Sequence, residues 1–235
     1  MQLSVILFDG FTALDVVGGY EVLSRVPDIQ VEFVAEEPDL ISADTRRLGL
    51  AAYRSLNDLE TTDILYVPGG PGVERLLADD RFLDRLAALH ATTTWTVGIC
   101  NGVGLLGAAG LVEGRRVATN WGWYDRIGAY GAIPTGARYE IDDKLVTGAG
   151  VSASIDTALV LTKALAGEEV MRLVQLGIEY YPDPPSPDTT IREVGSDARE
   201  LVLAYEDAVA IPLLTEPPAW HTYLEVRALG VGRTG

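Results

Sequence analysis

The sequence predicts an α/β protein whose mostly parallel sheet carries helices on both faces. Apolar, β-branched runs typical of buried strands alternate with segments of helical periodicity, and Gly- or Pro-containing turns separate them. Hydrophobic residues make up 48% of the 235-residue chain, enough for one sizeable core. We therefore expect a single domain over residues 1–210, followed by a loosely ordered tail over residues 211–235.

The first half of the chain shows this alternation clearly. Residues 3–8 predict the first central strand, which ends at the turn Asp9-Gly10. A helix follows over residues 12–26, where the spacing of Thr12 and Asp15 is typical of a capping box. Its expected apolar face consists of Leu14, Val17, Val22 and Val26. Further predicted elements are a strand over 30–35, a small hairpin within 40–53, a strand over 63–68, a helix over 79–91 and a strand over 95–99.

The second half continues the alternation and then loses it. A helix of small residues is expected over 103–111, and a short strand over 116–119. Residues 139–147 predict a hairpin about Asp142-Asp143. Further helices are predicted over 152–165, 168–180 and 191–209, with an extended Pro-rich stretch at 182–187 between the last two.

Cys100 lies at the junction of a predicted strand and a predicted helix, with Gly98 and Gly102 on either side. A side chain at this junction projects from the carboxyl edge of the sheet, where open α/β sheets keep their sites. The amide groups and partial positive charge of the following helix favour a thiolate. The pattern parallels a nucleophile elbow with Cys in place of Ser. The alternative is that Cys100 is a small buried hydrophobe.

Asp15 is the candidate partner of Cys100, because it follows a central strand and should reach the same sheet edge. A protonated carboxyl group there can donate to a thiolate and later move a proton. Its alternative role is the helix cap with Thr12. The histidines are weaker candidates: His90 lies in a helix well before the junction and His221 lies in the tail, so surface roles are expected for both.

A second candidate feature is the Gly-rich turn that follows the strand over 63–68. The backbone amides of Gly69, Gly70 and Gly72 could form an anion-binding nest. Pro71 limits that nest because it has no N–H group to donate.

Charge and composition exclude several classes of partner. The formal net charge of −16 argues against nucleic acid and against anionic membrane surfaces. A single cysteine excludes an internal disulfide and cannot alone build a thiolate metal site. The first residues have no basic region of a signal peptide, and no apolar run approaches the length of a membrane span. We therefore expect a cytoplasmic protein.

Several short motifs occur in an order and spacing that resemble one superfamily. The motifs are residues 14–18 (LDVVG), 68–72 (PGGPG), 99–102 (ICNG), 106–111 (LGAAGL), 119–121 (TNW), 148–156 (GAGVSASID) and 175–180 (QLGIEY). Together they resemble the ThiJ/PfpI superfamily and, within it, the isocyanide hydratases. The resemblance covers about residues 3–210.

This resemblance implies a flavodoxin-like sandwich, a homodimer, and a small-molecule substrate handled without metal or organic cofactor. It implies water addition to an isocyanide, giving an N-formamide. Cys100 would attack the terminal carbon to form a thioimidate. Asp15 would deliver a proton and then help to activate water.

The chain departs from the hydratase pattern at two positions. Asn101 follows the cysteine where the hydratases carry Thr, and Asn120 precedes Trp121 where they carry His. Amides still donate and accept hydrogen bonds, so we expect substrate or oxyanion binding by Asn101 and Asn120, together with Gly70, Gly72 and Trp121. Core packing is the alternative role for Trp121, Trp123 and Tyr124. The substrate is left open by these differences.

Two other functions remain as alternatives. One is a cofactor-free glyoxalase or an amidase-like hydrolase of the same superfamily, although Asn101 argues against a Cys–His mechanism because those branches commonly place His after the nucleophile. The other is a non-catalytic thiol sensor or ligand-binding module.

Overall fold

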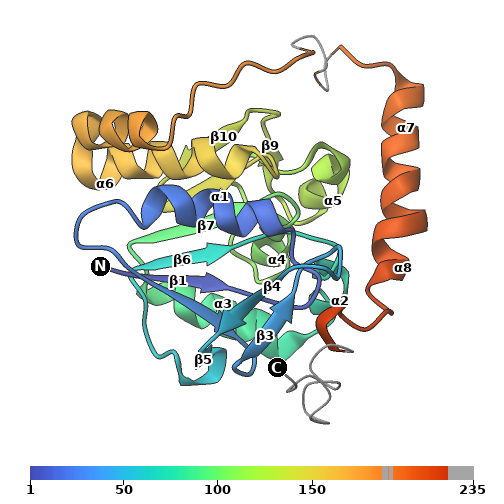
Figure 1. Ribbon diagram of the computed structural model, residues 1–235, viewed down its shortest axis with the longest axis horizontal. Coiled ribbons are helices and arrows are strands. Elements are labelled where there is room, and N and C mark those ends of the chain that lie inside the picture. The colour runs from blue at the N-terminus through green and yellow to red at the C-terminus, as the bar shows by residue number, and fades with distance from the viewer. Residues whose placement is uncertain (187–189, 191–192, 222–235) are drawn as a thin grey trace, which may run out of the picture.

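A seven-stranded sheet in the order β10-β11-β7-β6-β1-β2-β5 forms the centre of the computed structural model (Figure 1). The structure describes residues 1–186, 190 and 193–221. All neighbouring strands run parallel except β10, which pairs antiparallel with β11 at one edge. The predicted mostly parallel sheet is therefore confirmed. Its strands are β1 (Gln2–Ile6), β2 (Gln30–Ala35), β5 (Arg54–Ser55), β6 (Ile64–Val67), β7 (Trp95–Ile99), β10 (Tyr139–Asp142) and β11 (Leu145–Gly148).

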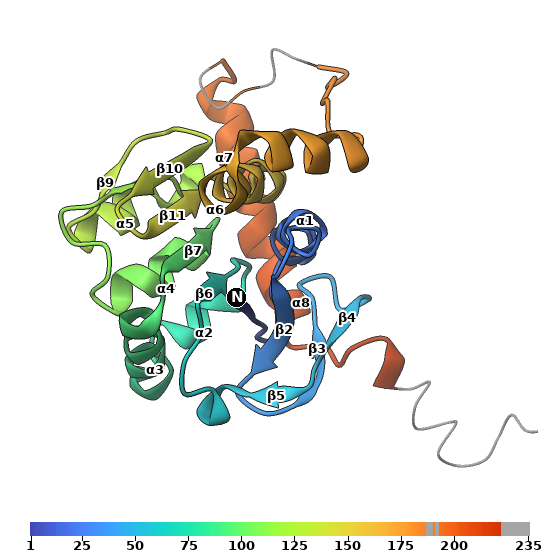
Figure 2. The same cartoon turned by 90° about the vertical axis from the view of Figure 1, so that its left-hand side faces the viewer.

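Helices cover both faces of the sheet, as predicted. Figure 2 shows α1 (Ala13–Leu23) and α6 (Ala153–Gly177) on one face, with α3 (Asp80–Thr92) and α4 (Gly102–Ala108) on the other. α1 and α6 approach so closely that a Cβ added at Gly18 would overlap the Ser154 hydroxyl. α6 is interrupted at Gly167, whose φ of +88° breaks it into the two helices that the sequence predicts.

Smaller elements fill the connections. The predicted hairpin after β2 is confirmed as β3 (Asp39–Ser42) paired antiparallel with β4 (Gly49–Ala52). The sequence did not predict α5 (Tyr124–Ala129), α2 (Val73–Leu76) or the two-residue strand β9 (Ile133–Pro134), which pairs with β8 (Arg116–Val117). Short 3₁₀ turns occupy Leu56–Asp58 (η1) and Trp121–Trp123 (η2).

The C-terminal helix begins later than predicted. α7 (Ser196–Tyr205) continues into a π-helical turn η3 (Glu206–Ala210) and a short α8 (Ile211–Leu213). Residues 222–235 of the predicted tail lie outside the described residues, as do residues 187–189 and 191–192 of the preceding stretch. Among the described residues, no helix is both long and apolar enough to cross a membrane.

The expected apolar face of α1 is wrong for two of its four residues, and the expected capping box is wrong. Leu14 and Val17 point outward and are 39% and 37% exposed, whereas Asp15, Val16, Gly18 and Gly19 are buried. Val22 and the following Val26 are buried as predicted. The inward face of α1 thus combines apolar side chains with two glycines and one carboxyl group. The capping box does not form either, since the Thr12 hydroxyl donates to Asp44 Oδ2 at 3.0 Å.

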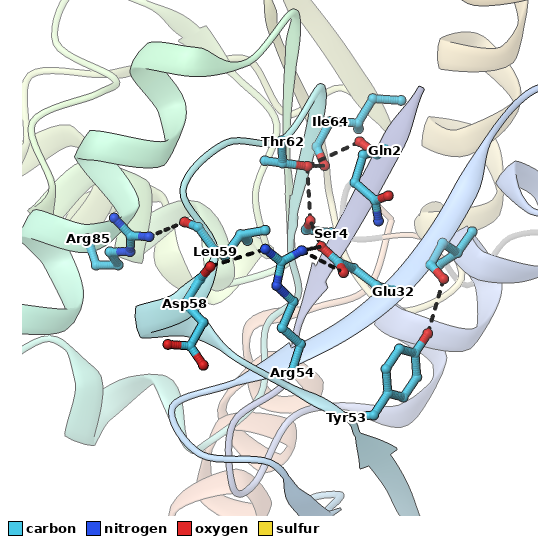
Figure 3. A network of polar contacts seen from close by, with 11 residues as sticks. Gln2, Ser4, Glu32, Tyr53, Arg54, Asp58, Leu59, Thr62, Ile64 and Arg85 are labelled. Carbon is cyan, nitrogen blue, oxygen red and sulfur yellow. Dashed lines mark hydrogen bonds and ion pairs between the residues drawn. The ribbon is translucent and has the colours of Figure 1, made fainter.

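A polar network joins the neighbouring strands β1, β2 and β5 (Figure 3). The Ser4 hydroxyl donates to Glu32 Oε1 at 2.8 Å, and Arg54 donates to both oxygens of the same carboxylate. Ser4 also donates to the Thr62 hydroxyl at 2.9 Å. The hydrogen bonds and the ion pair compensate the buried charge of Glu32, which would otherwise destabilise the core. They also hold β5 against β2 and β1.

Candidate active site

The topology of the sheet brings three loops together. β1, β6 and β7 are neighbouring parallel strands, so the loops that follow them meet at one edge. α1, after β1, covers one face, whereas α3, after β6, covers the other. This is a topological switch point, the place where open α/β sheets leave a crevice for ligands. Asp15 follows β1, Gly69 follows β6 and Cys100 follows β7.

Cys100 occupies a sharp turn between β7 and α4. Its φ of +58° lies in the left-handed region that non-glycine residues rarely adopt. Two hydrogen bonds fix its backbone: the Cys100 N–H donates to the Gly148 carbonyl at 3.0 Å, and the Thr119 hydroxyl donates to the Cys100 carbonyl at 2.7 Å. The strand–turn–helix geometry that the sequence predicts is therefore present.

Asp15 is fully buried and receives two hydrogen bonds from distant parts of the chain. The Gly69 N–H donates to Oδ2 at 2.8 Å, and the Val151 N–H donates to Oδ1 at 3.0 Å. Burial raises the pKa of Asp15 to about 7, even though these two bonds lower it. The negative charge of Asp44 raises this pKa further. Asp15 therefore holds or releases a proton near neutral pH.

Asp15 and Cys100 lie on either side of Gly69. A Cβ added at Gly69 would lie 2.7 Å from Cys100 Cβ and 2.9 Å from Asp15 Oδ2. The predicted proximity of Cys100 and Asp15 is therefore confirmed. A side chain at position 69 would push them apart, so only glycine fits there.

The expectation that the helix N-terminus favours a thiolate is wrong for this environment. Burial is the largest effect on Cys100 and raises the pKa of its thiol well above the ordinary value, and the Asp15 carboxylate raises it further. Hydrogen bonds from the Asn101 N–H and the Asn120 side chain lower that pKa, but burial outweighs them.

The predicted nest of backbone amides is also wrong. The Gly70 N–H donates to Asn101 Oδ1 at 2.7 Å, and the Gly72 N–H donates to the Gly10 carbonyl at 3.2 Å. Together with the Gly69–Asp15 bond, this uses all three N–H groups inside the chain. The loop therefore positions Asp15 and Asn101, and offers no free set of donors to an anion.

The two asparagines lie on different sides of Cys100. Asn101 makes a two-point bridge to Gly70, because its Nδ2 also donates to the Gly70 carbonyl at 3.1 Å. Asn120 accepts from the Gly122 N–H at 2.8 Å and presents its amide to the Cys100 sulfur. Trp121 is half-buried at the start of η2. Contact of Trp121, Gly70 and Gly72 with substrate stays a prediction.

Three positioning groups were not predicted. The Tyr66 hydroxyl donates to the Asp15 carbonyl at 2.6 Å and fixes the start of α1 from the buried side. Val151 has a φ of +39°, which turns its N–H toward Asp15. At Gly150, with a φ of +154°, an added Cβ would lie 3.3 Å from Cys100 Sγ. The sequence signal was the motif GAGVS at 148–152, whose two glycines mark a close backbone approach.

His90 takes no part in this arrangement. Its Nδ1 lies 2.8 Å from the hydroxyl of Thr96, which is near the start of β7, whereas Cys100 follows its end. The ring is half-buried, in contrast to the expected surface role, and burial lowers its pKa to about 4. A Cys–His pair with His90 is therefore excluded by its position.

Fold and site together define a flavodoxin-like α/β protein with a cysteine in a strained strand–helix turn beside a buried carboxyl group. The sequence model of the DJ-1/PfpI family matches residues 1–164. The chain belongs to the DJ-1/PfpI family, as the resemblance implies.

Curated and solved relatives agree with this assignment. The chain is 38% identical over 204 residues to an isonitrile hydratase from Pseudomonas putida, covering 85% of this chain and 89% of the relative. A ThiJ/PfpI family protein from Pseudomonas syringae superposes with a TM-score of 0.83 at 27% identity, over 92% of this chain and 90% of its own. Toxoplasma gondii DJ-1 gives a TM-score of 0.68 at 22% identity, covers 77% of this chain and 99% of its own, and shares the fold.

The raised pKa of Asp15 predicts how stability depends on pH. Its value rises from 3.8 to about 7 on folding, so the folded state binds the proton more tightly. The resulting stabilisation amounts to at most about 4 kcal/mol. It is complete below about pH 4 and is lost as the pH rises through 7. We expect Asp15→Asn to gain stability relative to the parent between pH 4 and pH 8, measured by urea unfolding.

Asp142 supplies a control of opposite sign. The N–H of Arg116 and the Arg115 guanidinium lower the pKa of Asp142, so its contribution is lost as the pH falls. Asp142→Asn should therefore differ from the parent in how the free energy of unfolding depends on pH at low pH. Near neutral pH the two pH dependences should be the same. A parallel pH profile for Asp15→Asn and its parent would show that Asp15 does not titrate near 7.

Proposed function

We propose that this protein adds water to isocyanides to give N-formamides, with Cys100 as the nucleophile and Asp15 as the acid–base group. The observation that carries the proposal is the pair itself: a buried carboxyl with a pKa of about 7 beside a sulfur in a strained turn. The relationship to an isonitrile hydratase over most of both chains supports the same reaction.

In the first step the Cys100 sulfur bonds to the terminal carbon of the isocyanide. One proton moves to that carbon, so the product is a thioimidate with a C=N double bond. The proton originates on the thiol, whose pKa is raised, and Asp15 is placed to take it and pass it on. A carboxylate that gains the proton also removes the negative charge that disfavours the thiolate.

In the second step water adds to the thioimidate carbon, and the carbon–sulfur bond breaks. Asp15, now ionised, takes a proton from the water. The nitrogen and the departing sulfur each end with one proton, which gives the N-formamide and the free thiol. Overall, one water is added to one isocyanide, without net oxidation or reduction.

Asn120 is the residue best placed to stabilise the charge that develops during these steps. Its side chain faces the Cys100 sulfur, and its carbonyl is already held by the Gly122 N–H, which leaves the amide hydrogens toward the site. Asn101 serves a different purpose in this scheme, because its bridge to Gly70 keeps the Gly69 N–H on Asp15.

We infer a homodimer from exposed apolar side chains on α1 and next to Asp15. Leu14, Val17 and Tyr20 are all more than one-third exposed on α1, and Val151 is 42% exposed next to Asp15. Burial of this surface by a second copy would remove apolar area from water. The interface would then lie beside Asp15 and Val151.

Replacement of Cys100 tests the nucleophile. Cys100→Ala and Cys100→Ser should both remain folded, because the backbone of the turn is held by Gly148 and Thr119, and both should lose nearly all catalysis. Cyclohexyl isocyanide and methylglyoxal, followed by product formation, distinguish hydration from the glyoxalase alternative. Substantial hydration by purified Cys100→Ala would remove this mechanism, and no product from either substrate would favour a sensor.

Asp15→Asn tests the acid–base group. The change keeps the size of the side chain but removes the transferable proton, and loss of such a group typically costs about 100- to 10,000-fold in rate. We expect a folded protein whose Cys100 still reacts with iodoacetamide and whose kcat for isocyanides falls within that range. A fall of less than about tenfold would place the proton donor elsewhere.

The dimer is checked by light scattering at micromolar concentration. We expect a mass of twice the 25.2 kDa of the chain. Val17→Glu should shift the mass toward the monomer, because it places a charge in the proposed interface, whereas Leu173→Glu, on an exposed position of α6, should leave it unchanged. A monomeric parent protein contradicts the inference.

A further inference from the structure

The C-terminal segment returns to the edge of the sheet at which Cys100 lies. In Figure 1, α7 and α8 stand beyond the ends of β1 and β6, on the side to which their arrows point. The match to the family model ends at residue 164, so these helices lie outside the part of the chain that it matches. None of the side chains of α7 is buried, although it carries several large apolar residues.

Two leucines of this segment contact the two loops beside Cys100. A Cβ added at Gly122 would lie 3.0 Å from Leu203 Cδ2, and one added at Gly10 would lie 2.6 Å from Leu214 Cδ2. Gly122 is hydrogen-bonded to Asn120, which faces the sulfur, and Gly10 accepts from Gly72 in the Gly-rich loop. The stretch from Leu203 to Leu214 therefore spans the site from one flanking loop to the other.

The far end of the segment is fastened to the β3–β4 hairpin. Arg46 Nε donates to the Glu216 carbonyl at 2.9 Å, and the Ala219 N–H donates to the Arg46 carbonyl at 2.9 Å. Arg46 is itself held by Asp9 at 2.6 Å. A Cβ added at Gly49 would lie 2.8 Å from the Trp220 ring, so this side chain also rests on the hairpin.

Glu206 lies between these contacts, at the first position of the π-helical turn. Single π-turns occur often at functional sites. The Glu206 carboxylate raises the pKa of the Cys100 thiol, although it is the smallest of the causes, after burial and Asp15. Burial in turn raises the pKa of Glu206. Asp44 adds negative charge near Asp15.

We propose that the segment between Leu203 and Leu214 forms the outer wall of the substrate site, with these two leucines toward the substrate, and that Glu206 discriminates against anionic substrates. This deepens the proposed function, on which it rests for the reaction at Cys100. The substrate class is then an uncharged, apolar isocyanide. A carboxylated one meets a negative charge at the entrance.

Alkylation of Cys100 tests the wall without any hydratase assay. The chain has one cysteine, so each alkylation rate reports this sulfur alone. Iodoacetamide and iodoacetate differ mainly in charge. In Glu206→Gln we expect the ratio of iodoacetate to iodoacetamide rates to rise on the order of fivefold at low salt, and to approach the parent ratio at about 1 M salt.

Glu200→Gln is the matched control, because it makes the same change in α7, before the position at which Leu203 meets Gly122. Its ratio should equal that of the parent. Equal ratios in Glu206→Gln and Glu200→Gln would overturn the proposal. The ratio corrects for any change in the pKa of the thiol, since that change affects both reagents alike.

The apolar part of the wall is tested with two neutral isocyanides. Leu203→Ala should lower kcat/KM for cyclohexyl isocyanide relative to methyl isocyanide by about threefold to tenfold, whereas Leu201→Ala, 72% exposed on the same helix, should not. An unchanged preference in Leu203→Ala would overturn this part. If Cys100→Ala still hydrates isocyanides, the proposed function is refuted but the discrimination by Glu206 is not. The iodoacetate-to-iodoacetamide ratio does not depend on hydratase activity.

Discussion

The buried carboxyl group of Asp15 is the feature on which the rest of the site depends. Its oxygens accept from Gly69 and Val151, which lie 54 and 136 residues further along the chain, and its carbonyl accepts from Tyr66. A carboxyl group taken out of water is costly unless such donors surround it or a proton neutralises it. Both happen here, since two N–H groups are present and the pKa is about 7.

The sequence could predict the strands, the alternation and the junction at Cys100, because these follow from local periodicity and turn chemistry. It also placed Asp15 near Cys100, since loops after neighbouring parallel strands share an edge. The direction of the Asp15 side chain was beyond local reasoning. The pairing of Thr12 with Asp15 has the spacing of a capping box, but Thr12 turns to Asp44, a residue 32 positions away. The predicted anion-binding nest is wrong for the same reason, because the Gly70 N–H donates to Asn101, 31 residues away.

The reactivity of Cys100 shows how a local rule and its tertiary context can oppose each other. A strand–helix turn favours a thiolate through the helix dipole, but the sulfur is buried and an acidic group lies beside it, and both raise its pKa. The two groups are therefore coupled: the thiolate becomes less costly when the proton resides on Asp15. Within the proposed mechanism, the carboxyl group would be needed to make the nucleophile as well as to move protons.

The C-terminal segment beyond the family match at residues 1–164 has a consequence for specificity. Cys100 and Asp15 are held by the sheet and by close contacts at Gly69 and Gly150, which leave little freedom for change. A family that uses one fold for several functions must vary selectivity elsewhere. The segment from Leu203 to Leu214 meets the loops beside the site at Gly122 and Gly10, so we expect changes in its side chains to alter selectivity while the pair at Asp15 and Cys100 stays in place.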